Sequence, residues 1–260
     1  NAAGGEMLVN QTTSGSQNTT TNGGGNLAMD SSGNYAVVWT DAANGNDVYA
    51  RLFYADGTAR TNEFKVHAAN ASAQDDAHVA MADDGKFVVT WNDDRSGTNE
   101  LYMRLFNADG TTVTSETQVS TLANGQGNSA VDFDSSGNYV VAFRDNTTSN
   151  IYFQRYNSSG VAQGSNTIVN TTTTDVQNDP DVAVNDNGTF VVTWSSNAQD
   201  GSGYGIYAQR FTASGVTAGS EFLVNQTTSG NQEYATVDSD SSGNFVVTWR
   251  SDAGGYTDVF

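Results

Sequence analysis

The amino-acid sequence predicts an all-β protein built from five copies of one four-stranded unit. The hexamer "DSSGNY" at residues 30–35 returns in similar form at 82–87, 134–139, 185–190 and 240–245. A large aromatic residue stands six positions after the glycine of each hexamer, and no segment has helical periodicity. The glycines are Gly33, Gly85, Gly137, Gly188 and Gly243, and the aromatic residues are Trp39, Trp91, Phe143, Trp194 and Trp249.

Each period of about 52 residues contains four short apolar segments of strand length. In the unit around Gly188 they are "DVAV" (181–184), "FVVTW" (190–194), "GIYAQRF" (205–211) and "EFLVN" (221–225). Their content of Val, Tyr, Phe, Trp and Thr is typical of β-strands. Because the links between them are short and rich in Gly, Asn and Asp, the strands are expected to be antiparallel.

A four-stranded unit of this length is typical of a β-propeller blade. The chain opens with "NAAGGEMLVN" (1–10), which matches a fourth strand, and ends with "TDVF" (257–260), which matches the first half of a third strand. We therefore expect residues 1–260 to form a single five-bladed β-propeller domain with four antiparallel strands per blade. The N-terminal fourth strand is expected to pair with the C-terminal third strand and close the ring. The alternative is a segment of a longer array with another number of blades.

Composition excludes several classes of function. A net charge of −19, with only ten Lys and Arg residues, opposes binding to nucleic acid or to an anionic membrane. The chain has no cysteine and two histidines, which removes thiolate chemistry and zinc sites. No apolar run reaches the length of a membrane span. The acidic, Lys-poor composition favours a secreted or cell-surface bacterial protein.

The repeated hexamer has two interpretations, a metal loop or a turn. A calcium loop needs carboxylates at alternating positions and a distal bidentate Glu, whereas here Ala82 and Asn185 replace the first acid in two copies. A tight turn needs Asp or Asn first and Gly where φ is positive. All five copies have the Gly, and four of them begin with Asp or Asn. The turn is the preferred interpretation. The aromatic slot is likewise interpreted as core packing rather than as a row of ligand-stacking platforms.

Polar side chains of the loops after the second and fourth strands are the candidate ligand-binding residues. These loops share one face of the predicted propeller, and functional residues concentrate on loops held by a rigid scaffold. The alternative is that the loops are polar because they are solvated and that the glutamines satisfy loop backbone. The candidates are Asp41, Asp93, Asp145, Asp200, Asp252, Tyr204, Tyr256, Gln17, Gln74, Gln126, Gln177 and Gln232. The third-strand arginines (Arg51, Arg104, Arg155, Arg210) and the glutamates that open fourth strands (Glu6, Glu63, Glu116, Glu221) are expected to form exposed ion pairs.

The repeat as a whole resembles the tandem units of very large bacterial secreted and surface proteins. The resemblance is carried by "NDNGTFVVTW" (185–194), "GIYAQRF" (205–211) and "EFLVN" (221–225), and it extends over essentially the whole chain. It implies an extracellular, multidomain setting rather than a particular activity. The five-fold plan also resembles five-bladed lectins, although no lectin motif matches residue by residue.

These observations predict a non-catalytic extracellular module that binds polysaccharide or another glycan, or mediates adhesion, through repeated weak sites. Catalysis would require one blade to differ from the others, and the loop acids occupy similar positions in all blades. No catalytic residue, metal ligand or cofactor is therefore expected. Calcium bridging by the acidic face has no defined ligand spacing behind it. The alternatives are a purely structural unit of a large surface protein and a glycoside-cleaving enzyme, which would need a pair of carboxylates.

Overall fold

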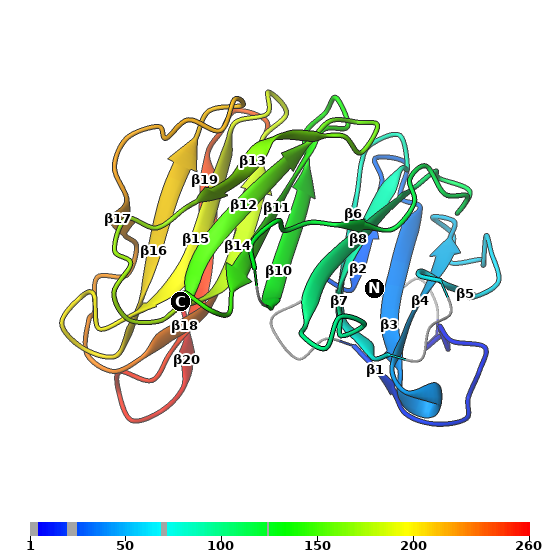
Figure 1. Cartoon of the computed structure of the whole chain (residues 1–260), viewed down its shortest axis with the longest axis horizontal. Helices are drawn as coiled ribbons and strands as arrows, with labels where there is room; N and C mark the ends of the chain where they lie inside the picture. Colours follow the sequence, from blue (N-terminus) through cyan, green and yellow to red (C-terminus); the bar gives the residue numbers. More distant parts are fainter. Residues whose placement is uncertain (1–4, 20–24, 69–71, 124) are drawn as a thin grey trace.

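A computed structural model describes residues 5–19, 25–68, 72–123 and 125–260. It is an all-β structure in which five antiparallel sheets follow one another in chain order and form an arch (Figure 1). No helix in these residues has the length and apolar character needed to cross a membrane. Residues 1–4, which belong to the predicted N-terminal strand, lie outside the described residues.

The sheets are named A to E in chain order. Sheet A contains β1 (Gln17–Asn18), β2 (Leu27–Met29), β3 (Tyr35–Asp41), β4 (Asp47–Phe53) and β5 (Phe64–Lys65), with a short 3₁₀ helix, η1 (Ala42–Asn44), between β3 and β4. Sheet B contains β6 (Gln74–Met81), β7 (Phe87–Asp93), β8 (Glu100–Phe106) and β9 (Thr117–Gln118).

The other three sheets repeat this order. Sheet C contains β10 (Gln126–Phe133), β11 (Tyr139–Asp145), β12 (Asn150–Tyr156) and β13 (Ala162–Ile168). Sheet D contains β14 (Gln177–Val184), β15 (Phe190–Asn197), β16 (Tyr204–Phe211) and β17 (Phe222–Leu223). Sheet E contains β18 (Gln232–Ser239), β19 (Phe245–Ser251) and β20 (Asp258–Val259).

The first strand of each sheet lies on the inner side of the arch. Strands β2, β6, β10, β14 and β18 each contact the first strand of the neighbouring sheet, whereas the fourth strands pair only with the third strands of their own sheets. The predicted four-stranded antiparallel unit is therefore confirmed in sheets B, C and D. We call β2, β6, β10, β14 and β18 the inner strands.

The core consists of aromatic and β-branched side chains packed between neighbouring sheets. Trp91, Phe143 and Trp194 have no exposed surface, which confirms that the aromatic slot is core. Each of these rings stacks on a tyrosine of the adjacent third strand, for example Trp91 on Tyr102 with ring centres 6.2 Å apart. Trp249 of sheet E is partly exposed because no further sheet covers it.

The repeated hexamer is a turn between the first and second strands. In the first copy, Gly33 N donates to Asp30 O at 3.0 Å, and Gly33 has φ +83°. The Asp30 carboxylate accepts the backbone N–H of Ser32 and of Asn34, at 2.9 and 2.8 Å. Its acceptor oxygens are thus used by the turn itself, which confirms the turn interpretation.

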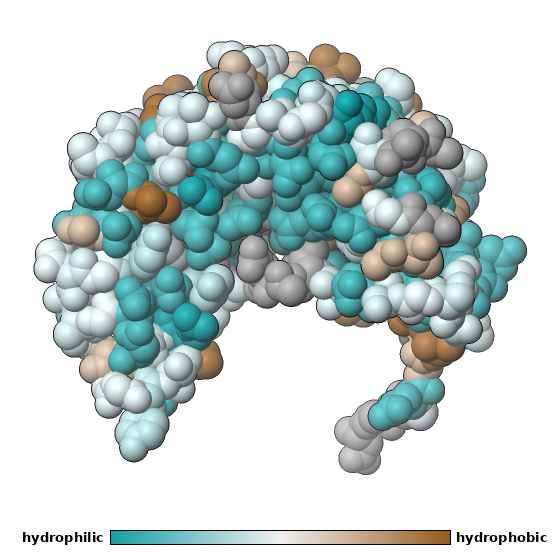
Figure 2. All heavy atoms as spheres, turned by 60° about the horizontal axis from the view of Figure 1, so that its bottom comes forward, coloured by the Kyte–Doolittle hydropathy of each residue, from teal (hydrophilic) through white to brown (hydrophobic). Residues whose placement is uncertain are grey.

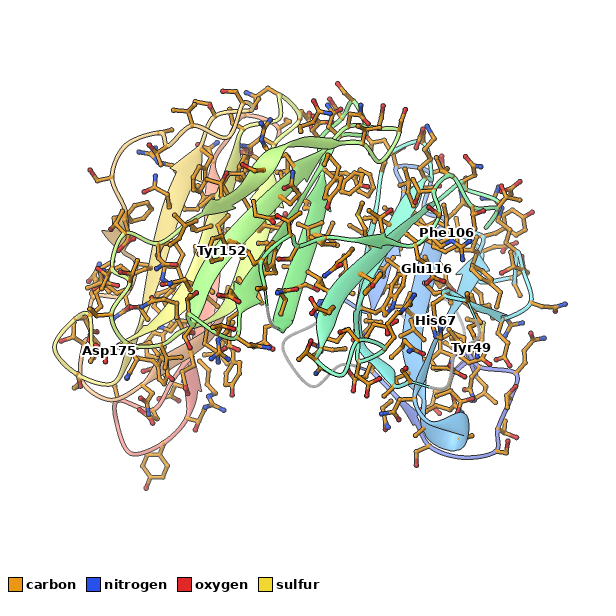
Figure 3. The ribbon with its side chains drawn as sticks, viewed as in Figure 1. Tyr49, His67, Phe106, Glu116, Tyr152 and Asp175 are labelled. Carbon is orange, nitrogen blue, oxygen red and sulfur yellow. The ribbon has the colours of Figure 1, made fainter. Side chains whose placement is uncertain are left out.

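Neighbouring sheets are linked by side chains that were expected to form exposed ion pairs. Glu63 accepts N–H bonds from Gln11 at 2.6 Å and Thr12 at 3.0 Å, and Arg51 donates to Val9 O at 2.7 Å. Glu116 accepts from Ala68 N at the next junction, between sheets A and B, where it is labelled beside His67 (Figure 3). For Arg51 and Glu63 the expectation of an ion pair was wrong, because their partners here are backbone groups. Glu116 combines the backbone bond with an ion pair to Arg95 at 2.8 Å.

The predicted closure of a five-bladed ring is not observed. Among the described residues β20 pairs only with β19, and residues 5–16 contain no strand. The two ends of the arch do not meet (Figure 1). Apolar side chains are exposed at both ends, with Leu27 58% and Met29 57% exposed on sheet A, and Val246 62% and Val259 80% exposed on sheet E. Residues 9–12 are instead held by Arg51 and Glu63 of sheet A.

Candidate active site

The predicted loop acids Asp41, Asp93 and Asp145 end the second strands of sheets A, B and C. All three are buried, and each accepts hydrogen bonds from its own loop. Asp41 accepts from Ala43 N at 2.8 Å, Asp93 from Arg95 N at 3.0 Å, and Asp145 from Thr148 N at 3.0 Å. These bonds shape the loops, and ligand contact by the three side chains stays a prediction.

The recurrent glutamines Gln17, Gln74, Gln126, Gln177 and Gln232 begin the first strands of the five sheets. All except Gln17 are at most 1% exposed. Gln177 accepts from Trp194 Nε1 at 3.0 Å, and Gln232 donates to Ser229 O at 3.0 Å. These positions agree with the alternative interpretation, in which the glutamines form hydrogen bonds with loop backbone and buried core groups. A role of the glutamines in ligand binding stays a prediction.

The four remaining candidates lie in the loops of sheets D and E. Asp252 accepts from Asn231 Nδ2 at 3.0 Å, and Asn231 Oδ1 in turn accepts from Tyr204 N at 3.2 Å. The structure thus brings Asp252 and Tyr204 to one loop cluster. Asp200 accepts from Ser202 N at 3.1 Å, and Tyr256 is 81% exposed.

A repeated irregularity shapes four of the inner strands. The pairing with the second strand shifts register after Asp75, Gly127, Asn178 and Glu233, and the next residue has a positive φ in each case. These residues are Asp76 (φ 52°), Asn128 (φ 45°), Asp179 (φ 48°) and Tyr234 (φ 55°). Such β-bulges redirect side chains and are common beside active sites. The bulge residue differs from sheet to sheet, so this position breaks the symmetry of the repeat.

The inner strands enclose a pocket of about 240 Å³ on the concave side of the arch. It is lined by residues of β6, β10, β14 and β18, including His78, Asn128, Asp179, Asp181 and Tyr234. Figure 2 shows that this side of the molecule is hollowed and that hydrophilic residues line it.

Asp179 is the carboxyl group of this pocket with an environment suited to proton transfer. Burial, together with the negative charge of Glu233, raises the pKa of Asp179 to about 6, although Arg144 and a bond from Asn128 oppose the rise. Asn128 Nδ2 donates to Asp179 Oδ1 at 3.1 Å. The other oxygen, Oδ2, is therefore the one that can carry a proton. A carboxyl group with a pKa near 6 is partly protonated at the pH where many enzymes work.

A second carboxylate, Glu233, comes from the neighbouring inner strand β18. It forms an ion pair with Arg250 at 2.9 Å, and the guanidinium of Arg250 lies 4.7 Å from the ring centre of Tyr234. Burial and then the charge of Glu233 raise the pKa of Tyr204. Asp179, Glu233 and Tyr204 therefore share one electrostatic environment, which we call the Asp179 cluster.

Two further inner-strand carboxyl groups connect neighbouring sheets. Asp132 accepts from Val184 N at 2.7 Å, and Asp181 accepts from Val237 N at 2.8 Å. Burial raises the pKa of Asp132 to about 7 and that of Asp181 to about 6, against the lowering effect of their N–H bonds. No group of three or more His, Cys, Asp or Glu residues in the described part of the chain is arranged to hold a metal ion. Neither calcium nor another cofactor is assigned to this site.

Comparison with solved structures identifies the fold. The endo-arabinase of Bacteroides thetaiotaomicron is 14% identical, with a TM-score of 0.52 and 88% of each chain covered. An α-L-arabinanase of Penicillium chrysogenum in complex with arabinobiose is 13% identical, with a TM-score of 0.56 over 90% of this chain and 76% of the other. The Dos1 propeller is 11% identical, with a TM-score of 0.51 over 91% of this chain and 54% of the other. The chain has a β-propeller fold. No protein-family model and no curated protein matches the sequence.

The comparison overturns the expectation of a non-catalytic binding module. Similar propellers include an endo-arabinase and an arabinanase, which are glycan-cleaving enzymes by name. The expectation rested on the similar positions of acids in the loops after the second strands. The Asp179 cluster contains carboxyl groups that differ between sheets, so the symmetry argument against catalysis does not apply to it.

Sequence reasoning missed Asp179 and Glu233 because the first strands were taken to begin later in the chain. It missed Arg144 and Arg250 because the second strands were taken to end at the core aromatic residue, whereas β11 and β19 extend beyond it. In sheet D the expected strand was 181–184, whereas β14 begins at Gln177. A signal was present in the repeat. The residues after the recurrent glutamine read "DDAH" (75–78), "GNSA" (127–130), "NDPD" (178–181) and "EYAT" (233–236), and they differ in every unit.

Proposed function

We propose that the protein is a glycan-cleaving enzyme with its active site at the Asp179 cluster. One observation carries the proposal: two inner strands bring together a carboxyl group of raised pKa, Asp179, and a second carboxylate, Glu233. Hydrolysis of a glycosidic bond uses such a pair, in which one group donates a proton and the other acts as base or nucleophile. The arabinanases of similar fold make a polysaccharide the first substrate to test.

In this mechanism Asp179 Oδ2 carries the proton that the leaving glycosidic oxygen receives. Asn128 holds the other oxygen of Asp179, which orients the proton toward the pocket. Glu233 is the base or nucleophile, and its ion pair with Arg250 fixes the position of the carboxylate. Tyr234, at the bulge of β18, lines the pocket and offers a ring against which a sugar can pack.

The test is release of oligosaccharides from a panel of polysaccharides that includes arabinan. Asp179→Asn and Glu233→Gln preserve shape and remove the carboxyl function, so each should lower kcat/KM at least about a hundredfold. Asp83→Asn is the matched control, because Asp83 is exposed in the turn of sheet B and should retain full activity. Absence of product from every polysaccharide, or full activity of both site variants, would contradict the proposal.

The pH profile gives a second test. Asp179 acts in its protonated form, so kcat/KM should fall as pH rises through about 6. The fall should approach tenfold per pH unit above that value. A wild-type profile that stays level from pH 5 to 8 would assign the proton to another group.

We also propose that the setting is extracellular and that the ring is completed by the chain ends. Composition and the resemblance to tandem units of bacterial surface proteins support the setting. Residues 220–232, "SEFLVNQTTSGNQ", match residues 5–17, "GEMLVNQTTSGSQ". Because Tyr207 pairs with Leu223 in sheet D, the matching pair across the closure would be Phe260 and Leu8.

Closure can be tested in this cysteine-free chain with one engineered disulfide. Leu8→Cys combined with Phe260→Cys should form an intramolecular disulfide on oxidation, seen as a faster band on a non-reducing gel. Leu8→Cys combined with Val246→Cys is the control, since Val246 lies on a different strand, β19. Cross-linked dimers without an intramolecular product would favour an open array.

A further inference from the structure

Arg144 differs from the residues at its repeat position in the other sheets. This position, directly after the core aromatic residue, holds Thr40, Asn92, Arg144, Ser195 and Arg250. The two arginines lie on either side of sheet D, which contributes Asp179. Across the strand pair, Arg250 faces Glu233, whereas Arg144 faces Gly127. Only one of the two arginines therefore has a carboxylate opposite it.

The guanidinium of Arg144 lacks an ionic partner within the described residues. No Asp or Glu in them lies within 4.0 Å of it. Its Nη2 donates to Ser149 Oγ at 3.2 Å, and its buried Nε has no hydrogen-bond partner in the described structure. An arginine that is partly buried without a counter-charge is costly, unless a ligand supplies the negative charge.

Arg144 also lies close enough to the Asp179 cluster to influence its groups. Its positive charge acts to lower the pKa values of both Asp179 and Tyr204, although burial raises both. Asn128 follows Gly127, the residue that pairs with Arg144, and its Nδ2 donates to Asp179 Oδ1 at 3.1 Å. The position of Arg144 is thus at the margin of the proposed active site, on the sheet C side.

We propose that Arg144 binds the carboxylate of a uronic acid residue, and that the substrate is an anionic glycan rather than a neutral one. This deepens the proposed glycan-cleaving function and rests on it for the identity of the ligand. A planar guanidinium can donate two parallel N–H bonds to a carboxylate. Gly127 pairs with Arg144 and carries no side chain of its own, and the amide of Asn146 lies beside it, 3.3 Å from where a Cβ would stand.

The net charge of −19 does not prevent such binding. Physiological salt screens exposed charges over about 8 Å, so the distant acids act weakly on a ligand in the pocket. Asp179, whose pKa responds to the charge of Arg144, has a raised pKa of about 6 and is largely neutral below that pH. The positive charge of Arg144 is therefore only partly neutralised by nearby carboxylates.

The test is isothermal titration of the protein with oligogalacturonate and with its methyl ester, a neutral ligand of nearly the same shape. Wild type should bind the acid at least about tenfold more tightly than the ester. Arg144→Gln should remove this preference and leave binding of the ester unchanged. Arg144→Lys should restore part of it, and Arg210→Gln, which removes an exposed charge elsewhere, should behave as wild type.

Equal binding of acid and ester, wild-type preference in Arg144→Gln, or no binding of either ligand would overturn the proposal. Its failure is separable from failure of the proposed function. Cleavage of arabinan with no effect of Arg144→Gln would retain the enzyme and exclude the uronate subsite. Arg144-dependent binding of the acid by a protein that cleaves no polysaccharide would retain the subsite and exclude the enzyme.

Discussion

At the scale of single residues, the carboxyl groups of the inner strands have different roles, which cannot be told from the residues next to them in the sequence. Asp132 and Asp181 each bond to the backbone of the next sheet, whereas Asp179 lies at a bulge two residues before Asp181 and bonds to the Asn128 side chain. Asp179 and Asp181 both line the pocket. All three share a raised pKa because burial disfavours their charge. The same physical cause therefore yields a structural link in two cases and a candidate acid in the third.

Asp132→Asn should change how stability depends on pH. The pKa of Asp132 is about 7 in the folded protein and near 3.8 when unfolded, so the folded state binds the extra proton between these values. The wild-type contribution is therefore most favourable below pH 4 and is lost as pH rises toward 7. Asparagine does not ionise, and its single amide oxygen can accept from Val184 N or from Phe133 N but not from both, which adds a loss that does not depend on pH.

The measurement is the free energy of unfolding of both proteins by urea at several pH values. Relative to wild type, Asp132→Asn should gain about 1–3 kcal/mol between pH 4 and pH 7.5. A constant difference across this range would show that Asp132 has an ordinary pKa. Asp83→Asn serves as the control, since that carboxylate is exposed.

At the scale of the element, the turn between first and second strands shows how much a short pattern can specify. Asp or Asn at its first position accepts bonds from the turn backbone, and Gly takes the positive φ that a side chain would strain. The bulge in the first strand is different. Its positive φ falls on Asp, Asn or Tyr, and no glycine marks it in the sequence. Tertiary contacts between inner strands impose it.

Gly188→Ala tests the turn of sheet D. Gly188 has φ +80°, and an added Cβ would lie 3.1 Å from the Cβ of Ala213 and 3.2 Å from Asp134 Oδ2. Strain and crowding should lower the free energy of unfolding by about 1–3 kcal/mol, measured by urea denaturation. Gly254→Ala, at a position with open space and no positive φ, should be neutral. Equal stability of the two variants would contradict this account.

At the scale of the whole molecule, one kind of contact recurs at the junctions of sheets A and B, B and C, and C and D. The acid or amide that precedes a fourth strand accepts N–H bonds from the chain that leaves the preceding sheet. Glu221 does so between sheets C and D, where it accepts from Thr171 N at 2.6 Å and from Gln199 Nε2 at 2.6 Å. Asn166 takes the same role between sheets B and C.

Glu221→Ala should weaken the junction of sheets C and D. The N–H groups of Thr171 and Gln199 lose a charged acceptor, so the free energy of unfolding should fall by about 1–3 kcal/mol. Asp186→Ala is the control, because Asp186 is an exposed acid in the turn of sheet D. A neutral effect of Glu221→Ala would place the stability of the junction in its apolar contacts alone.

The amino-acid sequence determined the strand pattern, the repeat length and the turns, because these depend on residues that are close in the chain. The period-2 apolar segments and the Gly positions are read directly, and Trp91 and Trp194 follow as core. Only the tertiary structure decided the site. The site combines residues from three different sheets: Asp179, Glu233 and Arg144. Asp179 lies in the pocket at a β-bulge, and no residue next to it in the sequence predicts that bulge. Pairing between the two ends of the chain is likewise outside the reach of local sequence, since it depends on contacts between segments that are far apart in the chain.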